Sequence, residues 1–464
     1  MPRLESDSIG TLEVPDNVYY GVQTLRALEN FPITGEQVHP AFKRALGDVK
    51  VACAQANLAI GQLPKDIAQA IIQAAEEMAE GKWDHEIVVD PIQGGAGTSL
   101  NMNANEVIAN RALEILGLPK GSYDKIHPNT HVNMAQSTND VIPTAFRIAL
   151  LRVIDQTLGT LEGLVQAFKD KAAEFDQVLK MGRTHLQDAV PIRLGQEFGA
   201  YARVLQRDVE RLRSVREGLF TINMGATAVG TGLNADPAYI EQVVQILAER
   251  TGYPLQSSED MVDATQNIDA LINVSSVFKT CAINLVKIAN DLRLMASGPK
   301  AGFADIHLPP RQPGSSIMPG KVNPVMPEVV NQVAFRIIGN DQTVALVGQA
   351  GQLELNVMQP VLFYSLLQSV DILRNAIDVF TRYCVTGIQA NEKHTRAIAE
   401  SSPSLATALN PYIGYQTAAE IAKKSLATGR SVRDLVLERG LLSEDLLDEV
   451  LQPDALTEPR SLSK

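Results

Sequence analysis

The residues best suited to chemistry lie in the segment Gly314-Ser315-Ser316-Ile317-Met318-Pro319-Gly320-Lys321-Val322-Asn323-Pro324. Its glycines and prolines predict a loop that moves, with a serine pair near the start. A serine acts as a base only when a neighbour stabilises its alkoxide, which Lys321 or amide donors of the loop could do. Such a loop would bring the base to a substrate only after water has left. The alternative is a hinge loop with solvated serines.

Three further polar stretches, rich in Gly, Ser, Thr and Asn, separate apolar segments. They are Gly95 to Ser99 followed by Asn101, Asn103, Asn105 and Glu106, then His131 to Asp140, and Gly182 to Asp188. Each precedes a predicted helix, so any one of them is explained as a helix cap, a position that these residue types favour. Helix N-termini also bind carboxylates and phosphates through their free N–H groups. Converging helix starts would therefore form a pocket for a molecule with two anionic groups.

Several common motifs are absent from the sequence. It has no GxSxG and no HExxH, and the run from Gly314 to Lys321 is one residue too long for a P-loop and is followed by Val322. His127 and His131 have the spacing of metal ligands but lie in a loop rich in Pro and Asn. We interpret these two histidines as structural or solvated, and the sequence predicts no metal site.

Three apolar patterns that alternate steps of three and four residues predict long helices. They run from Leu151 to Ala172, from Leu271 to Met295 and from Phe363 to Cys384, and a looser one runs from Leu194 to Leu219. Sustained over several heptads, this spacing is typical of long helices packed at shallow angles in a bundle. Further Ala, Val and Ile residues flank each stripe, so we expect the bundle to complete its burial by oligomerising with closed symmetry. The alternative is a monomeric bundle.

The fold class predicted from these patterns is mainly α, in three regions. Residues 1–140 are mixed, with short strands possible near the start, residues 141–393 carry the long helices, and residues 394–464 form a small helical domain. Pro143 is expected in the first turn of a helix, where proline is tolerated, and Pro360 at a helix start or bend.

Composition limits the classes of function. The chain has 464 residues, with 41 Lys and Arg against 53 Asp and Glu, so its net charge is −12. This acidic balance, without a basic tract, argues against a nucleic-acid partner. Charged residues interrupt the most apolar stretches and the first residues have no apolar signal core, so we expect neither a membrane span nor a secretory signal. The three cysteines Cys53, Cys281 and Cys384 are far apart, which suits a reducing cytoplasm.

In this order, the four polar stretches resemble those of the aspartase/fumarase superfamily. The segment from Gly314 to Pro324 matches the family's signature loop, and Tyr20 to Thr24 and Asn410 to Tyr415 are also similar. The resemblance covers essentially the whole chain. It implies a three-domain, mainly α-helical subunit, whose central domains form a 20-helix core in a homotetramer. Each active site would then be shared between three subunits and bind a small dicarboxylate.

The resemblance also implies a reaction, the reversible anti elimination that yields fumarate through an aci-carboxylate intermediate. Because a proton beside a carboxylate is a poor acid, preorganised donors must hold the developing dianion. By resemblance, Ser315 is the base, and the β-carboxylate is held by Thr98, Ser137, Thr138 and Ser316. The α-carboxylate is held by Thr184, Lys321 and Asn323, while Asn139 and His185 face the leaving group and Glu328 orients His185. No cofactor is implied for this step, and activation by Mg²⁺ stays open.

Local sequence distinguishes the two main activities of the family. Gln136 to Asp140, Asn223 to Thr227 and Pro324 to Val333 have the form found in aspartases. Two departures point the other way, because Gln359 stands where aspartases tend to carry an acidic residue and Ser401 to Leu405 is closer to some fumarases. The resemblance therefore favours elimination of ammonia from aspartate. Class II fumarate hydratase is the alternative, and a catalytically silent structural homologue is a further one.

Overall fold

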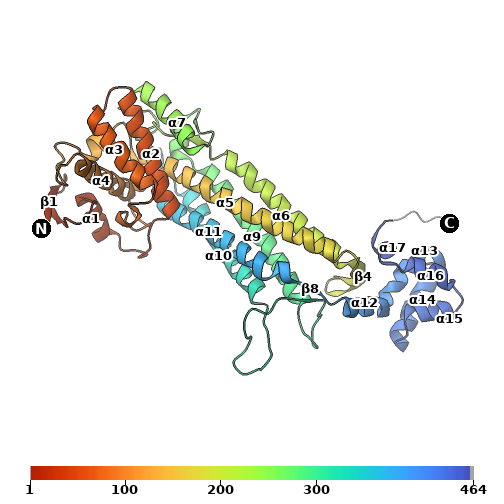
Figure 1. Ribbon diagram of the computed structural model, residues 1–464. Helices are drawn as coiled ribbons and strands as arrows, with labels where there is room; N and C mark the ends of the chain where they lie inside the picture. Colours follow the sequence, from red (N-terminus) through yellow and green to blue (C-terminus); the bar gives the residue numbers. More distant parts are fainter. Residues whose placement is uncertain (1, 460–464) are drawn as a thin grey trace. The chain divides into compact units, whose positions relative to one another are not determined.

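The computed structural model describes residues 2–459 and confirms a mainly α-helical fold (Figure 1). Within these residues, five helices have 24 or more residues, and they are α5 (Thr138–Glu174), α6 (Leu194–Glu217), α9 (Asp269–Met295), α10 (Val325–Gln349) and α11 (Gln359–Tyr383). At a rise of 1.5 Å per residue, α5 alone is about 55 Å long.

The three predicted apolar stripes form the buried faces of α5, α9 and α11. Every stripe residue on α9 is at most 6% exposed, and the stripe that ends at Cys384 is equally buried. The sequence pattern did not identify α10 as a long helix. Its buried face contains Asn340, whose side-chain amide donates to the backbone oxygen of Ser365 and the hydroxyl of Ser369 on α11. Asn340 therefore interrupts the apolar spacing of α10, although α11 provides hydrogen-bond acceptors for its side-chain amide.

The chain divides into two compact units. Within the described residues, the first consists of residues 2–158, 210–280 and 335–373, and the second of residues 159–209, 281–334 and 374–459. The three-domain division at residues 140 and 393 stays a prediction.

Short helices and two small sheets complete the first unit. The helices are α1 (Val22–Asn30), α2 (Pro40–Ala59), α3 (Lys65–Ala79), α4 (Thr98–Ile115), α7 (Pro237–Thr251) and α8 (Met261–Gln266), with η1 (Asp84–Glu86) and η2 (Pro128–Val132). Strands β1 (Arg3–Ser6) and β2 (Thr11–Val14) pair antiparallel, as expected for short strands near the start, and β5 (Thr221–Ile222) pairs parallel with β6 (Gln256–Ser257). Phe146 and Phe363 stack in the core and Phe42 meets both rings edge-on, which joins α2, α5 and α11.

The second unit contains two antiparallel two-stranded sheets and the C-terminal helices. Strands β3 (Leu179–Thr184) and β4 (Gln187–Arg193) pair antiparallel, as do β7 (Ile306–His307) and β8 (Gln389–Ala390). The helices are η3 (Val385–Gly387), α12 (Glu392–Ser401), η4 (Pro403–Leu409), α13 (Asn410–Ile413), α14 (Tyr415–Thr428), α15 (Val432–Glu438), α16 (Glu444–Val450) and α17 (Pro453–Thr457). Residues between Leu405 and Val450 form a hydrophobic cluster of their own, as a small helical region requires.

Two local expectations about helix starts were wrong. Helix α5 begins at Thr138, so Pro143 lies inside it rather than in its first turn. The polar stretch from Gly182 to Asp188 belongs to the β3–β4 hairpin and is not the start of a helix. The alternation of polar and apolar residues there is too short to have predicted two strands.

Helix α9 is long and apolar enough to cross a membrane by length and composition, and no other helix of residues 2–459 meets that criterion. The core helix of a globular protein can meet the same criterion, and the residues that form the apolar stripe of α9 are buried in the bundle.

Candidate active site

The first candidate segment turns the chain sharply into helix α4. Gly95, Ala96 and Gly97 all have left-handed backbone conformations, with φ of 84°, 56° and 95°. A Cβ on Gly97 would lie 3.1 Å from Ile142, so a larger residue would displace its neighbour. Thr98 is exposed at the first position of α4, and its hydroxyl donates to the oxygen of Gly95 at 2.7 Å. The strained Ala96 is typical of backbone held for function.

The second candidate segment leads into helix α5. The hydroxyl oxygen of Ser137 accepts the N–H of Asn139 at 3.2 Å, so Ser137 caps the helix and its own O–H stays able to donate to a ligand. The hydroxyl oxygen of Thr138 accepts the side-chain amide of Asn101 at 3.3 Å. Because Asn101 lies in the first turn of α4, this bond joins the two helix starts that carry Thr98 and Thr138.

Asp140 joins the start of α5 to the loop after β5. It is fully buried and accepts backbone N–H groups from Ser137 at 2.9 Å, Gly225 at 3.2 Å and Thr227 at 3.0 Å. Burial raises the pKa of the Asp140 carboxyl to about 7, and these three donors oppose the rise.

Asn139 is hydrogen-bonded to the loop that contains Gly225 and Thr227. Its side-chain amide donates to the oxygen of Ala228 at 2.7 Å, and Asn223 donates to its backbone oxygen at 3.0 Å. The segment from Asn223 to Thr227, which the family resemblance had singled out, therefore supports Asn139 and the start of α5.

Thr184 and His185 lie at the tip of the β3–β4 hairpin, and both are exposed. His185 and Leu186 form the two-residue turn with φ of 54° and 59°. A turn with two positive φ values usually uses Asn and Gly, so His and Leu are strained there. Strained backbone clusters at functional sites, so the hairpin tip is a candidate functional position.

Buried charges hold the hairpin in place. Asp305 is 1% exposed and pairs with Arg183 at 2.6 Å and with Lys180 at 3.3 Å. The hydroxyl of Ser402 donates to Asp188 at 2.9 Å. Ser402 belongs to the segment that departs from the usual aspartase sequence, and this bond gives its hydroxyl a contact with the hairpin.

The loop that carries Ser315 is closed by its own backbone. The N–H of Gly314 donates to the oxygen of Lys321 at 2.8 Å, and a Cβ on Gly314 would lie 2.6 Å from that oxygen. The hydroxyl oxygen of Ser315 accepts the N–H groups of Ile317 at 3.2 Å and Met318 at 3.1 Å. Hydrogen bonds to an oxygen favour its ionised form, so these amides could stabilise an alkoxide.

Lys321, Asn323 and Glu328 line one pocket, together with Arg293 and His307. Ser315 and Lys321 line a second pocket on the same loop. Asn323 is held by its amide, which donates to the oxygen of Gly314 at 2.9 Å. Arg293 and Lys321 make the first pocket suitable for an anion.

The structure places the candidate residues in two groups, one in each unit. The first unit holds Thr98, Ser137, Thr138 and Asn139, and the second holds Thr184, His185, Ser315, Ser316, Lys321, Asn323 and Glu328. Ser316 is exposed beside Ser315. Among the described residues no ion pair joins His185 to Glu328, so the expected pairing of these two residues stays a prediction, as do the assigned roles of the others.

One supporting residue, Lys50, was missed by the sequence reasoning, and its side chain contacts the segment before α5. Asn133 and Asp140 lie in the second polar stretch, but the sequence assigned them no role, and Asp140 contacts the loop after β5. A signal for Lys50 was present, because a lysine between Val49 and Val51 in an apolar helix is unusual. The sequence alone does not reveal which polar groups it meets.

The histidines singled out by their spacing have structural roles. The Nδ1 of His131 accepts the N–H of His127 at 2.8 Å, and the Nδ1 of His127 accepts the N–H of Asn129 at 3.0 Å. Both rings therefore satisfy the backbone around η2. Over residues 2–459, no group of three or more His, Cys, Asp or Glu side chains is placed to hold a metal.

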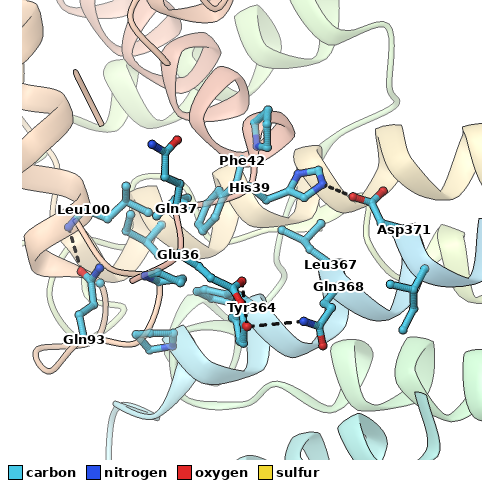
Figure 2. Close-up of a pocket in the computed structure, with 18 residues that line it drawn as sticks. Glu36, Gln37, His39, Phe42, Gln93, Leu100, Tyr364, Leu367, Gln368 and Asp371 are labelled. Carbon is cyan, nitrogen blue, oxygen red and sulfur yellow. Dashed lines mark hydrogen bonds and ion pairs between the residues drawn. The ribbon is translucent and has the colours of Figure 1, made fainter. Parts of the chain in front are cut away.

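A further pocket of about 290 Å³ lies in the first unit, and its walls come mainly from the segment before α2 and from α11 (Figure 2). His39 and Asp371 pair there at 2.7 Å, and the hydroxyl of Tyr364 donates to Glu36 at 3.0 Å. Gly97 lines this pocket, whereas no candidate site residue does.

Comparison with known proteins identifies the family. The family model described as "Lyase" matches residues 10–339, and the one described as "Fumarase C C-terminus" matches residues 405–458. The aspartate ammonia-lyase of Bacillus subtilis is 59% identical over 457 residues, which are 98% of this chain and 96% of that protein.

Two solved structures agree with this match. A protein described as fumarate lyase:delta crystallin from Brucella melitensis, bound to cobalt, is 49% identical with a TM-score of 0.97, and the match covers 99% of this chain and 100% of that one. The class II fumarase of Schistosoma mansoni is 34% identical with a TM-score of 0.92, covering 98% of each chain. The chain therefore belongs to the lyase family predicted from its four polar stretches, the aspartase/fumarase superfamily.

Proposed function

We propose that this enzyme, a carbon–nitrogen lyase, is an aspartate ammonia-lyase that converts L-aspartate reversibly to fumarate and ammonia. The observation that carries the proposal is full-length identity of 59% with an aspartate ammonia-lyase, against 34% with a class II fumarase over a similar length. The local contacts agree with it. The segment from Asn223 to Thr227, which has the aspartase form, is the one that holds Asn139 and Asp140.

In the proposed first step, the Ser315 alkoxide takes a proton from Cβ of aspartate. The electron pair of the C–H bond moves into the β-carboxylate and forms the aci-carboxylate. Its second negative charge would be held by hydroxyl donors at Thr98, Ser137, Thr138 and Ser316, acting as an oxyanion hole. The backbone N–H groups of Ile317 and Met318 support the base, because they already donate to the Ser315 oxygen.

In the second step, the aci-carboxylate collapses to form the Cα–Cβ double bond. The Cα–N bond of the protonated amino group breaks with its electrons going to nitrogen, so neutral ammonia leaves. Asn139 and His185 would face this leaving group, with Glu328 orienting His185. The α-carboxylate would be held by Thr184, Lys321 and Asn323, where the charge of Lys321 contributes most. We assign the stabilisation of the aci-carboxylate to the hydroxyl donors of the first step, and we propose that this stabilisation needs no metal.

We also propose that the enzyme is a homotetramer with sites shared between three subunits. One face of α10 is exposed along its length and consists of Gln332, Phe335, Arg336, Gly339, Gln342, Ala345 and Leu346. Phe335 is 59% exposed and Leu346 is 52% exposed. Large apolar residues and small ones on one helix face support packing against further helices. Five long helices per chain would give twenty in four copies.

We further propose a cytoplasmic location. Cys53, Cys281 and Cys384 are all buried free thiols, which suits a reducing compartment.

An assay of the purified enzyme with aspartate and with malate tests the proposed function. We expect ultraviolet absorbance from fumarate with aspartate and little or none with malate. Turnover of malate alone would assign the chain to fumarate hydratase. No turnover of either substrate would favour a catalytically silent structural homologue.

A further inference from the structure

We propose that Lys50 is a positioning residue that holds Ser137 and Thr138 in the orientation needed to stabilise the aci-carboxylate. This inference rests on the proposed function and extends it to a residue in helix α2, away from the candidate donors themselves. Lys50 would not contact the substrate but would act through the segment from Asn133 to Gln136.

The contacts of Lys50 lead directly to that segment. Its Nζ donates to the side-chain oxygen of Gln136 at 2.8 Å and to that of Asn133 at 3.1 Å. Gln136 precedes Ser137, the first of the two candidate donors. Asn133 in turn donates to the backbone oxygen of Gln136 at 3.1 Å. The ammonium group is therefore bonded to both ends of the turn that leads into α5.

The same network reaches Thr138 from the other side. The side-chain amides of Asn101 and Asn105 donate to the Asn133 oxygen, both at 3.2 Å. The amide of Asn101 also lies 3.3 Å from the hydroxyl oxygen of Thr138, to which it donates. Asn133 thus connects Lys50 with helix α4, and Asn101 on α4 connects Asn133 with Thr138. A displacement of Asn133 would therefore also displace Thr138.

The turn between these groups is strained, so it needs such support. Ala135 lies between Asn133 and Gln136 and has φ of 58°, a conformation uncommon for residues with a Cβ. Strained backbone persists only when surrounding contacts determine it, and here the contacts come from a lysine that is 0% exposed. Burial lowers the pKa of Lys50 to about 8. A buried ammonium is costly unless acceptors compensate for the lost water, and here Gln136 and Asn133 supply those acceptors.

A second buried lysine on the same helix supplies a matched control. Lys43 lies two turns earlier in α2 and is 1% exposed. Its Nζ donates to Gln37 at 3.1 Å and to the backbone oxygen of Asp84 at 2.7 Å, and neither is a candidate site residue. Burial lowers the pKa of Lys43 as well. Replacing either lysine with methionine removes a buried ammonium group from the same helix and leaves a side chain of similar length.

The test compares Lys50→Met with Lys43→Met, using two probes besides aspartate. Succinate is a saturated dicarboxylate that resembles the ground state. The nitronate dianion of 3-nitropropionate carries its extra charge on two oxygens, as the aci-carboxylate does. Binding of both probes is measured by calorimetry, kcat and KM are measured with aspartate, and folding is checked by circular dichroism.

For Lys50→Met we expect kcat and nitronate affinity each to fall by about 10²-fold, the effect of a misplacement of about 1 Å in a catalytic group. Succinate affinity should change by less than about threefold, and every value for Lys43→Met should also stay within that range. If Lys50→Met does not fold, Gln136→Met removes the same bond from its acceptor side and should give the same separation between the probes.

Three results would overturn the inference. The first is an unchanged nitronate affinity in the folded Lys50→Met enzyme. If Lys50→Met does not fold, the same result in Gln136→Met counts instead. Alternatively, Lys43→Met could lose as much nitronate affinity as Lys50→Met, which would reduce both lysines to structural roles. If the unmodified enzyme neither turns over aspartate nor binds the nitronate, the proposed function fails first and the inference falls with it.

Discussion

Replacing Ser315 with alanine is expected to lower kcat with aspartate by about 10³- to 10⁴-fold, because the variant has no base for the Cβ proton. The side chain is half-buried in a loop, where its oxygen accepts backbone N–H groups from Ile317 and Met318. Its loss should therefore leave the thermal unfolding midpoint and the assembly state nearly unchanged. Single-turnover absorbance of fumarate and analytical ultracentrifugation measure the two quantities.

The neighbouring Ser316→Ala variant is the matched control for this result. It removes a candidate donor and not the base, so a smaller loss of about 10²- to 10³-fold is expected. Retained turnover in Ser315→Ala would show that another group removes the proton. An equal loss in both variants would leave the roles of the two serines undistinguished and contradict the assignment of Ser315 alone as base.

Replacing Lys321 with alanine is expected to raise KM for aspartate and to lower kcat/KM by roughly 10- to 150-fold. The physical reason is loss of a charged hydrogen bond to the α-carboxylate, worth about 1.5–3 kcal/mol. Lys321 is exposed and lines the pocket that also contains Asn323 and Arg293, so its removal should not alter folding. Steady-state kinetics over a range of aspartate concentrations gives both constants.

Removal of another surface charge controls for a general electrostatic effect. Lys169 is exposed on α5 and lines none of the pockets described here, so Lys169→Ala should change kcat/KM by less than about twofold. Kinetics of Lys321→Ala that match those of Lys169→Ala would remove Lys321 from the proposed site.

The sequence predicted the bundle because long apolar stripes report directly on burial. The apolar stripe between Leu271 and Met295 alternates steps of three and four residues, and each residue of that stripe is buried in α9. The same reasoning missed α10, whose buried face includes Asn340 bonded to α11. Spacing rules treat such a residue as an interruption, since only tertiary contact shows that its amide is satisfied.

The candidate segments were found from residue type, but their local structures were less predictable. The stretch that contains Thr184 and His185 was expected before a helix start and instead forms a hairpin tip. Its turn residues are His185 and Leu186, which rarely adopt positive φ, so no turn signal was present in the sequence. The buried pairs of Asp305 with Arg183 and Lys180 hold this hairpin and join residues far apart in the chain.

Long-range polar contacts were beyond the reach of the sequence for the same reason. Lys50 is 83 residues from Asn133, and Asp140 is 87 residues from Thr227. Neither separation has a period or a motif that a single sequence displays. The family resemblance supplied the candidate roles, and the structure supplied the contacts that support Ser137, Thr138 and Asn139.

The central claim is that groups from neighbouring chains meet around one dicarboxylate, and subunit complementation tests it most directly. Ser315→Ala carries its defect in the second unit, and the double variant Ser137→Ala with Thr138→Ala carries its defect in the first. Each inactive variant is unfolded and refolded alone, and the two are also refolded together in equal amounts. If each site needs intact groups from two chains, the mixture should regain about a quarter of the unmodified turnover, because chains assemble at random in a closed oligomer. A mixture that stays as inactive as its parents would contradict the account.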